Sequence, residues 1–208
     1  MSVSSPLLEV ADLRAGYRTP VVGPLSLAIY PGEVVGLWGA NGSGKSTLLR
    51  AIALGARVFG GAIRRAPGLS LAYQEQQPVR LPLMPLTGRD LLRAAGADVA
   101  SVPGLLAPLL AQRIDRLSGG QYQLLSVWCA LGSPADLVLL DEPTNNLDPE
   151  IESLLTLILR SQRGRRAVLM VSHEREFLAA ACSRVFDVGG IPAPPVVSGQ
   201  DTERMRAP

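Results

Sequence analysis

The sequence predicts an α/β fold, and three features of its 208 residues support that prediction. Short β-like runs alternate with helical patterns along the chain. Several of these runs are almost wholly apolar, which is typical of strands that are covered on both faces. A glycine-rich stretch, GANGSGKST at residues 39–47, joins one apolar run to a helical pattern. Together these features favour a sheet with helices packed on its faces.

The elements can be assigned in order from the apolar runs and from the residues that punctuate them. We expect strands at PLLEVADL (6–13), LSLAIY (25–30), EVVGLWG (33–39), LSLAY (69–73), LVLLD (137–141), AVLMVSH (167–173) and RVFDV (184–188). We expect helices to begin at Gly44, near Thr87, at Ser118, near Pro149 and near Glu174. Residues 77–116 are rich in proline and lack strand-like alternation, so they indicate a small helical insertion. The segment 191–208 has no periodicity and predicts a loosely held, proline-rich end.

Composition and charge exclude several classes of function. The formal net charge is +2, from 20 basic and 18 acidic residues, so no nucleic-acid partner is expected. The start of the chain lacks the pattern of a signal peptide, and no apolar run approaches the ~18 residues of a membrane span. Cys129 and Cys182 have no metal-ligand spacing, so free thiols in a reducing, cytoplasmic setting are expected.

The stretch 39–47 fits the phosphate-loop pattern G-x-x-x-x-G-K-[ST], and it lies between a strand and a helix as that motif requires. Glycines let successive N–H groups point at an anion, and the following helix adds the positive end of its dipole. Lys45 offers a charge to the β- and γ-phosphates, and Ser46 offers its hydroxyl oxygen to Mg²⁺. The expected nucleotide-binding residues are Gly39, Asn41, Gly42, Ser43, Gly44, Lys45, Ser46 and Thr47.

Two carboxylates end the apolar run LVLLDE (137–142), at the edge of the sheet where open α/β folds bind ligands. Side chains alternate along a strand, so Asp141 and Glu142 are expected to point to opposite sides. Asp141 suits the Mg²⁺ shell, and Glu142 is then free to orient or polarise the attacking water.

A second helix start, in RLSGGQYQ (116–123), has the features of an anion cradle. Ser118 is a candidate N-cap, and Gly119 and Gly120 allow a close approach of the backbone. An ordinary capped helix is the alternative for this stretch taken alone.

The run LSGGQ (117–121) resembles the signature of the ATP-binding cassette (ABC) family, and the resemblance covers residues 6–190. It implies a P-loop NTPase core of the ABC ATPase type: a mixed sheet flanked by helices, a small antiparallel β part at the N-terminus and an inserted helical lobe. Residues 1–190 would form one nucleotide-binding domain, with 1–76 and 117–190 as the core and 77–116 as the helical insertion. In that family the signature, here Ser118, Gly119, Gly120 and Gln121, closes over ATP held by a second, head-to-tail cassette. The resemblance therefore implies a homodimer or heterodimer around two ATP.

The resemblance also assigns roles to isolated residues. Tyr17 would stack on adenine, although a core tyrosine is the alternative. Gln76 would reach Mg²⁺ and the attacking water; Gln74 and Gln77 compete for this role, and the family spacing from Tyr73 selects Gln76. Asp148, in DEPTNNLD (141–148), would lie near the partner cassette. His173 would contact the γ-phosphate, although a satisfied core histidine is the alternative.

The implied function is ATP binding and hydrolysis that drives a separate transmembrane permease, with peripheral attachment to the inner face of the membrane. The run at 76–92, QQPVRLPLMPLTGRDLL, resembles metal-ion (zinc or manganese) uptake cassettes. The runs DEPTNNLD and SHEREF (172–177) also resemble translation-factor cassettes that act on ribosomes, but those proteins carry two cassettes joined by a charged linker. The stretch LLSVWCAL (124–131) departs from the family, which commonly has an arginine and an ARAL-like segment there.

Overall fold

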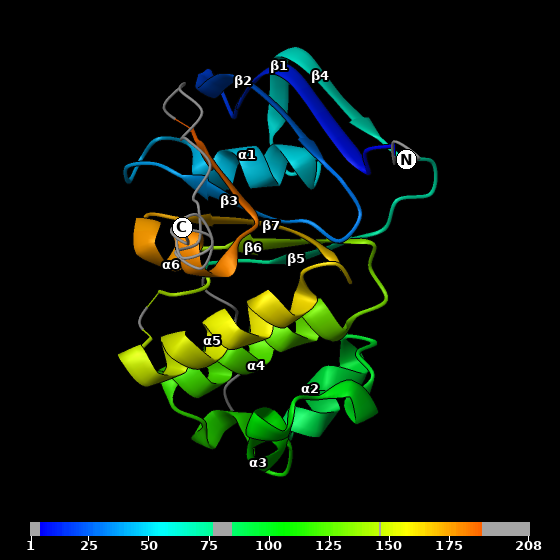
Figure 1. Ribbon diagram of the computed structural model, residues 1–208, viewed down its shortest axis with the longest axis vertical. Helices are drawn as coiled ribbons and strands as arrows, with labels where there is room; N and C mark the ends of the chain where they lie inside the picture. The colour runs from blue at the N-terminus through cyan, green and yellow to red at the C-terminus, as the bar shows by residue number, and fades with distance from the viewer. Residues whose placement is uncertain (1–4, 77–84, 146, 189–208) are drawn as a thin grey trace, which may run out of the picture.

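The computed structural model describes residues 5–76, 85–145 and 147–188 (Figure 1). Its strands form two separate sheets, and its helices lie around the larger one. The strands are β1 (Leu8–Gly16), β2 (Pro20–Ile29), β3 (Val34–Trp38), β4 (Arg57–Arg65), β5 (Leu71–Gln74), β6 (Leu137–Asp141), β7 (Ala167–Ser172) and β8 (Arg184–Asp187). The α-helices are α1 (Lys45–Ile52), α2 (Gly88–Ala94), α3 (Ala107–Leu110), α4 (Gly119–Gly132), α5 (Pro149–Gln162) and α6 (Arg175–Ala181).

The larger sheet has the strand order β5-β6-β7-β3-β8, and all four of its pairings are parallel. Every residue of β6 and β7 is buried, which explains their unbroken apolar runs. Parallel strands all end at one edge, so the chain segments that follow β3, β5, β6 and β7 converge there. The expectation of a mixed sheet is therefore wrong for the larger sheet, because all of its described pairings are parallel and the antiparallel pairings belong to the smaller sheet.

The smaller sheet is antiparallel, with the order β2-β1-β4. Its third strand, β4, was missed by the sequence analysis, and β2 begins five residues before the expected 25–30. The β4 sequence RVFGGAIRR has two central glycines, and none of its side chains is fully buried, so it lacks the apolar pattern of a core strand. Gly61 has φ +74°, and a Cβ there would lie 2.3 Å from the Ala11 oxygen, where the β1–β4 register shifts.

Alternate side chains of the larger sheet enter two different cores. On one face, Val35, Leu139 and Leu169 pack with α1 and the smaller sheet, so α1 lies between the two sheets (Figure 1). On the other face, Val138, Leu140 and Met170 pack with side chains of α4, α5 and α6. Both faces of the larger sheet are therefore covered, as the apolar strands predicted.

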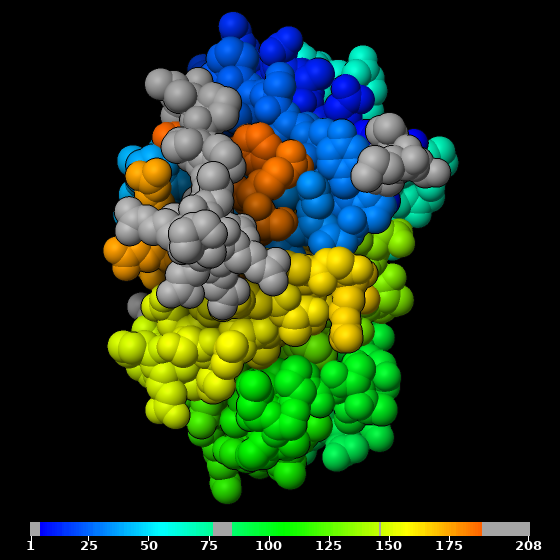
Figure 2. All heavy atoms as spheres, in the orientation of Figure 1, coloured from blue at the N-terminus to red at the C-terminus, as the bar shows by residue number. Residues whose placement is uncertain are grey.

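The segment between β5 and α4 is helical over its described part, residues 85–116. Thr87 caps α2 through a capping box with Asp90, close to the helix start predicted near Thr87. In the space-filling view α2 and α3 form one end of the molecule, and α5 lies between them and the sheets (Figure 2). The predicted tail at 191–208 and part of the predicted insertion, 77–84, lie outside the described residues. Over the rest, no helix has the length and apolarity that a membrane crossing requires.

Candidate functional site

The glycine-rich loop joins β3 to α1 at the edge where the parallel strands end. Gly42 and Gly44 have φ +82° and +88°, the left-handed region that favours glycine. A Cβ on Gly44 would lie 2.6 Å from the Val22 side chain, so that position also needs glycine for space. The loop therefore folds tightly over the start of α1, whose first N–H groups have no partner within the helix.

Lys45 begins α1 and is only 5% exposed. Its Nζ donates to the carbonyl oxygens of Gly39 at 2.7 Å and Ala40 at 3.1 Å, and it lies 3.5 Å from Oε1 of Glu142. A buried ammonium group requires such oxygen partners. The loop thus holds the charge of Lys45 beside the carboxylate of Glu142, which follows β6.

Asp141 is the last residue of β6, and both of its carboxylate oxygens accept hydrogen bonds. Oδ1 accepts from Ser46 Oγ at 2.7 Å, and Oδ2 accepts from the Tyr73 hydroxyl at 3.0 Å. Burial raises the pKa of Asp141, and the bonds from Ser46 and Tyr73 oppose that shift. Ser46 and Asp141, both predicted to hold the metal, are therefore in contact.

Glu142 follows the strand in a left-handed conformation, with φ +47°. Because it lies beyond the regular strand, the alternation expected from the sequence does not govern its direction. Its carboxylate is instead fixed by partners: His173 Nδ1 lies 2.9 Å from Oε2, and Lys45 lies near Oε1. Asp141 and Glu142 thus have separate partners, as their separate predicted roles require.

A cavity of about 330 Å³ opens between these elements. Val21, at the smaller sheet, and Gln76, just after β5, contribute to its wall together with the loop and Glu142. Of the three competing glutamines, Gln76 is in this cavity, Gln74 points to another one, and Gln77 lies outside the described residues. The complete lining is Val21, Asn41, Gly42, Gly44, Lys45, Ser46, Thr47, Gln76 and Glu142.

The cavity fits a nucleotide phosphate and a hard cation. The buried Ser43 Oγ has no hydrogen-bond partner among the described residues, and it lies in the loop that curls around the cavity. Oxygen atoms of Ser46 and Asp141, with Gln76 nearby, are the ligand type that Mg²⁺ prefers. The side-chain chemistry therefore matches the predicted ATP and Mg²⁺.

Tyr17 and His173 occupy surface positions. Tyr17 is 49% exposed and follows β1, which rules out the alternative of a core tyrosine; its hydroxyl accepts from Arg50 at 3.1 Å. The His173 side chain is 41% exposed and directly follows β7. Neither residue lines the cavity. Tyr17 is hydrogen-bonded to Arg50 of α1, and His173 is in contact with Glu142, which does line the cavity.

The second predicted set lies apart from this cavity. Ser118 caps α4 as predicted, in a capping box with Gln121, and the positions of Gly119 and Gly120 form the first turn. Asp148 caps α5 by accepting from the Ile151 N–H at 2.9 Å. None of these residues is part of the cavity lining, so a single chain holds two sets of candidate residues that do not meet.

The sequence did not predict Arg50 as a residue beside the site, and it did not predict the contact that Tyr73 makes there. Tyr73 entered the sequence analysis only as the aromatic residue that selects Gln76, and Arg50 not at all. The hydroxyl of Tyr73 donates to Asp141, and Arg50 donates to the Tyr17 hydroxyl and carries its positive charge near the phenol of Tyr73. A tyrosine instead of a phenylalanine before the glutamine was the available signal, because only tyrosine brings a polar group.

Comparisons with known proteins agree on one family. A family model described as ABC transporter matches residues 22–145. The zinc import ATP-binding protein ZnuC of Paracoccus denitrificans (strain Pd 1222) is 38% identical over 201 residues, covering 89% of this chain and 77% of that protein. The zinc import ATP-binding protein ZnuC of Roseobacter denitrificans is 38% identical over 189 residues, covering 86% and 73%. A solved ATP-binding subunit of an ABC transporter is 29% identical with TM-score 0.72, covering 87% of this chain and 85% of that one.

Proposed function

The chain belongs to the ABC transporter family, of which it is an ATP-binding subunit, and we propose that it hydrolyses ATP to drive a separate metal-ion permease. The observation that carries this proposal is the cavity in which Lys45, Ser46, Gln76 and Glu142 converge, while the signature residues lie elsewhere on the same chain. The names of its zinc-import relatives support metal ions as the cargo. The ribosome-acting alternative receives no support from these relatives.

The residues of the cavity divide the work of hydrolysis. Loop N–H groups and Lys45 hold the phosphates of ATP, with Tyr17 against the base. Ser46, Asp141 and Gln76 would hold Mg²⁺, which when bound neutralises charge on the phosphate oxygens. Glu142 accepts a proton from the water that attacks the γ-phosphorus, giving ADP and phosphate. His173, which is bonded to Glu142, is proposed to contact the same phosphate.

The second set of residues is proposed to act on a partner cassette. Ser118 and the glycines beside it present the first turn of α4, and a Cβ added at Gly119 would meet open space. An exposed helix start with room for close approach suits a phosphate brought by another molecule. Two cassettes in head-to-tail orientation would then enclose two ATP, with Asp148 near the shared boundary.

We expect Ser118→Arg to abolish steady-state ATP hydrolysis, because the bulky cation would block the approach of a second cassette. The affinity of the single chain for ATP should change little, since Ser118 does not line the cavity. Ser118→Ala is the matched control: it removes the N-cap, which costs about 1 kcal/mol of stability, without adding bulk. ATPase assays and nucleotide titrations measure both effects. Wild-type turnover in the arginine variant would leave α4 an ordinary capped helix.

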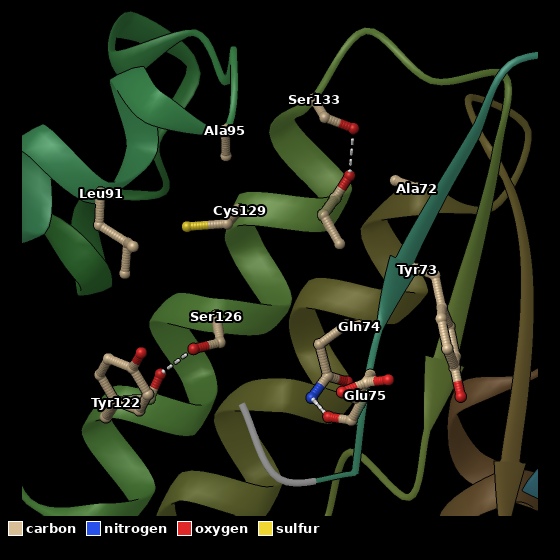
Figure 3. Close-up of a pocket in the computed structure, with 11 residues that line it drawn as sticks. Ala72, Tyr73, Gln74, Glu75, Leu91, Ala95, Tyr122, Ser126, Cys129 and Ser133 are labelled. Atoms are coloured by element: carbon tan, nitrogen blue, oxygen red, sulfur yellow. Dashed lines mark hydrogen bonds between the residues drawn. The ribbon is translucent and has the colours of Figure 1, made fainter. Parts of the chain in front are cut away.

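The permease is proposed to dock at a second cavity, of about 360 Å³, between β5, α2 and α4. Figure 3 shows one side of α4 facing α2 and the strand, with the sulfur of Cys129 directed towards Leu91. The wall is mostly apolar, since Ala72, Leu91 and Ala130 belong to it. An apolar side chain from a short permease helix would fit this cavity, and Gln76 follows the same strand towards the nucleotide.

Protection of Cys129 tests this docking. Burial raises the pKa of both thiols to about 12, so the native protein should react slowly with a maleimide at neutral pH. Membranes that contain the cognate zinc permease should slow the labelling of Cys129 at least several-fold. Cys182, which is 6% exposed and not part of this cavity, is the internal control. Mass spectrometry of tryptic peptides separates the two thiols, and equal Cys129 labelling with and without permease would contradict the proposal.

A further inference from the structure

We propose that Tyr73 is a positioning residue for Asp141, and that it ties the position of β5 to the metal site. This inference rests on the proposed function, because it assumes that Asp141 holds Mg²⁺ beside ATP. The element involved is β5, which lies at the edge of the larger sheet and pairs in parallel with β6. In that pairing Tyr73 is the register partner of Leu139, two residues before Asp141.

The first support is the way in which Asp141 is held. Its Oδ2 accepts from the Tyr73 hydroxyl at 3.0 Å, and its Oδ1 accepts from Ser46 Oγ at 2.7 Å. Two donors on different oxygens define the rotation of a carboxylate group, whereas a single donor leaves it free to turn. Tyr73 therefore sets which oxygen faces Ser46, the other residue proposed to hold the metal. Such outer partners of metal ligands orient them strongly.

The second support is the cation behind the phenol. Arg50, on α1, donates to the Tyr17 hydroxyl at 3.1 Å, and its positive charge lies near the Tyr73 phenol, where it opposes the rise in the pKa of Tyr73 that burial causes. An ionised carboxylate can only accept, so the phenol proton of Tyr73 is directed to Asp141. A donor polarised by a cation makes a stronger bond to a carboxylate. Arg50 and Tyr73 thus lie between Tyr17, which we propose holds the base, and Asp141.

The third support is the alternation of side chains on β5. Tyr73 and Gln74 project to opposite sides of the strand (Figure 3). Tyr73 and Gln74 both belong to the wall of the cavity that we propose for the permease; Gln74 is buried there, whereas the Tyr73 hydroxyl extends to Asp141 on the nucleotide side. Movement of β5 would therefore be transmitted to the Asp141 carboxylate through one hydroxyl. This route is separate from Gln76, which lies beyond the end of the strand.

The expected effect of Tyr73→Phe is specific to the metal. The ring stays in place while Oδ2 of Asp141 loses its donor, so the carboxylate is less well oriented for Mg²⁺. We expect the gain in ATP affinity on adding Mg²⁺ to fall about tenfold, as is typical for outer partners of metal ligands. Affinity measured in excess chelator should match the wild type, because Tyr73 does not line the nucleotide cavity.

The test is a titration of fluorescent ATP into the wild type, Tyr73→Phe and Tyr30→Phe, each with Mg²⁺ and with chelator. Tyr30→Phe is a matched control, since it also removes one phenol hydroxyl. Tyr30 lies before β3, at the end opposite the glycine-rich loop, beside Arg184. A merely structural role for Tyr73 would lower both affinities together, or leave both unchanged, and either result overturns the inference. Absence of ATP binding or of a Mg²⁺ effect in the wild type would instead overturn the proposed function, and the inference with it.

Discussion

Replacing Lys45 by alanine is expected to lower the affinity for ATP by about 3 kcal/mol, because charge-assisted bonds to the phosphates are lost. Lys45 is buried at the start of α1, and no other lysine occurs in the chain. Isothermal titration with ATP measures the loss directly. The single lysine offers a second readout, since ATP should protect the wild-type chain from a lysine-specific acylating reagent. Unchanged ATP affinity in the variant would refute the assigned phosphate site.

The Lys45→Ala variant requires a control for stability. Lys45 and Glu142 form an ion pair at 3.5 Å in which both side chains are nearly fully buried. Removing one member of a buried pair costs about 3–5 kcal/mol, because the remaining charge has no full compensation. Here the carbonyl contacts of Lys45 and the His173 contact of Glu142 moderate that cost. The double variant Lys45→Ala/Glu142→Gln should recover thermal stability without recovering ATP binding, which separates folding from recognition.

The second large effect is expected for Glu142→Gln. The amide cannot accept the proton of the attacking water, so hydrolysis should fall about 10²- to 10⁴-fold. ATP binding should remain, because the loop and Lys45 are unchanged and Lys45 keeps its bonds to Gly39 and Ala40. Single-turnover assays with radiolabelled ATP separate the two steps.

Glu174, at the start of α6, offers a matched control for Glu142→Gln. Glu174 accepts a hydrogen bond from Thr144 at 2.9 Å and does not line the nucleotide cavity. Glu174→Gln keeps an acceptor oxygen for Thr144 and should hydrolyse ATP at nearly the wild-type rate. If Glu142→Gln were equally active, another group would have to accept the proton, and the role assigned to Glu142 would be wrong.

The sequence predicted best where one local stretch carries both structure and chemistry. The loop between β3 and α1 combines an apolar strand, glycines with positive φ and a helix start, and all three signals are local. The cap at Ser118 and the helix start near Pro149 were also predicted, because such signals need only residues a few positions apart. The buried strands β6 and β7 were evident because both of their faces are covered.

The failures have an opposite cause. Strand β4 is paired on one side only and its side chains stay partly exposed, so its sequence carries no strong period. The contacts among Tyr17, Arg50, Tyr73 and Asp141 join four separate parts of the chain, and no local pattern records them. The position of the Glu142 carboxylate likewise depends on Lys45, in α1, and on His173, which follows β7. Such arrangements exist only after the sheet has formed.

The central claim is that each ATP is enclosed by the loop of one cassette and the signature turn of another. Light scattering of Glu142→Gln coupled to size exclusion, with and without ATP and Mg²⁺, tests it most directly, because the variant binds ATP but cannot use it. We expect the molar mass to double only when both are present, and Ser118→Arg in the same background to prevent the doubling. A variant that binds ATP and Mg²⁺ yet keeps the mass of one chain at every protein concentration would contradict the account.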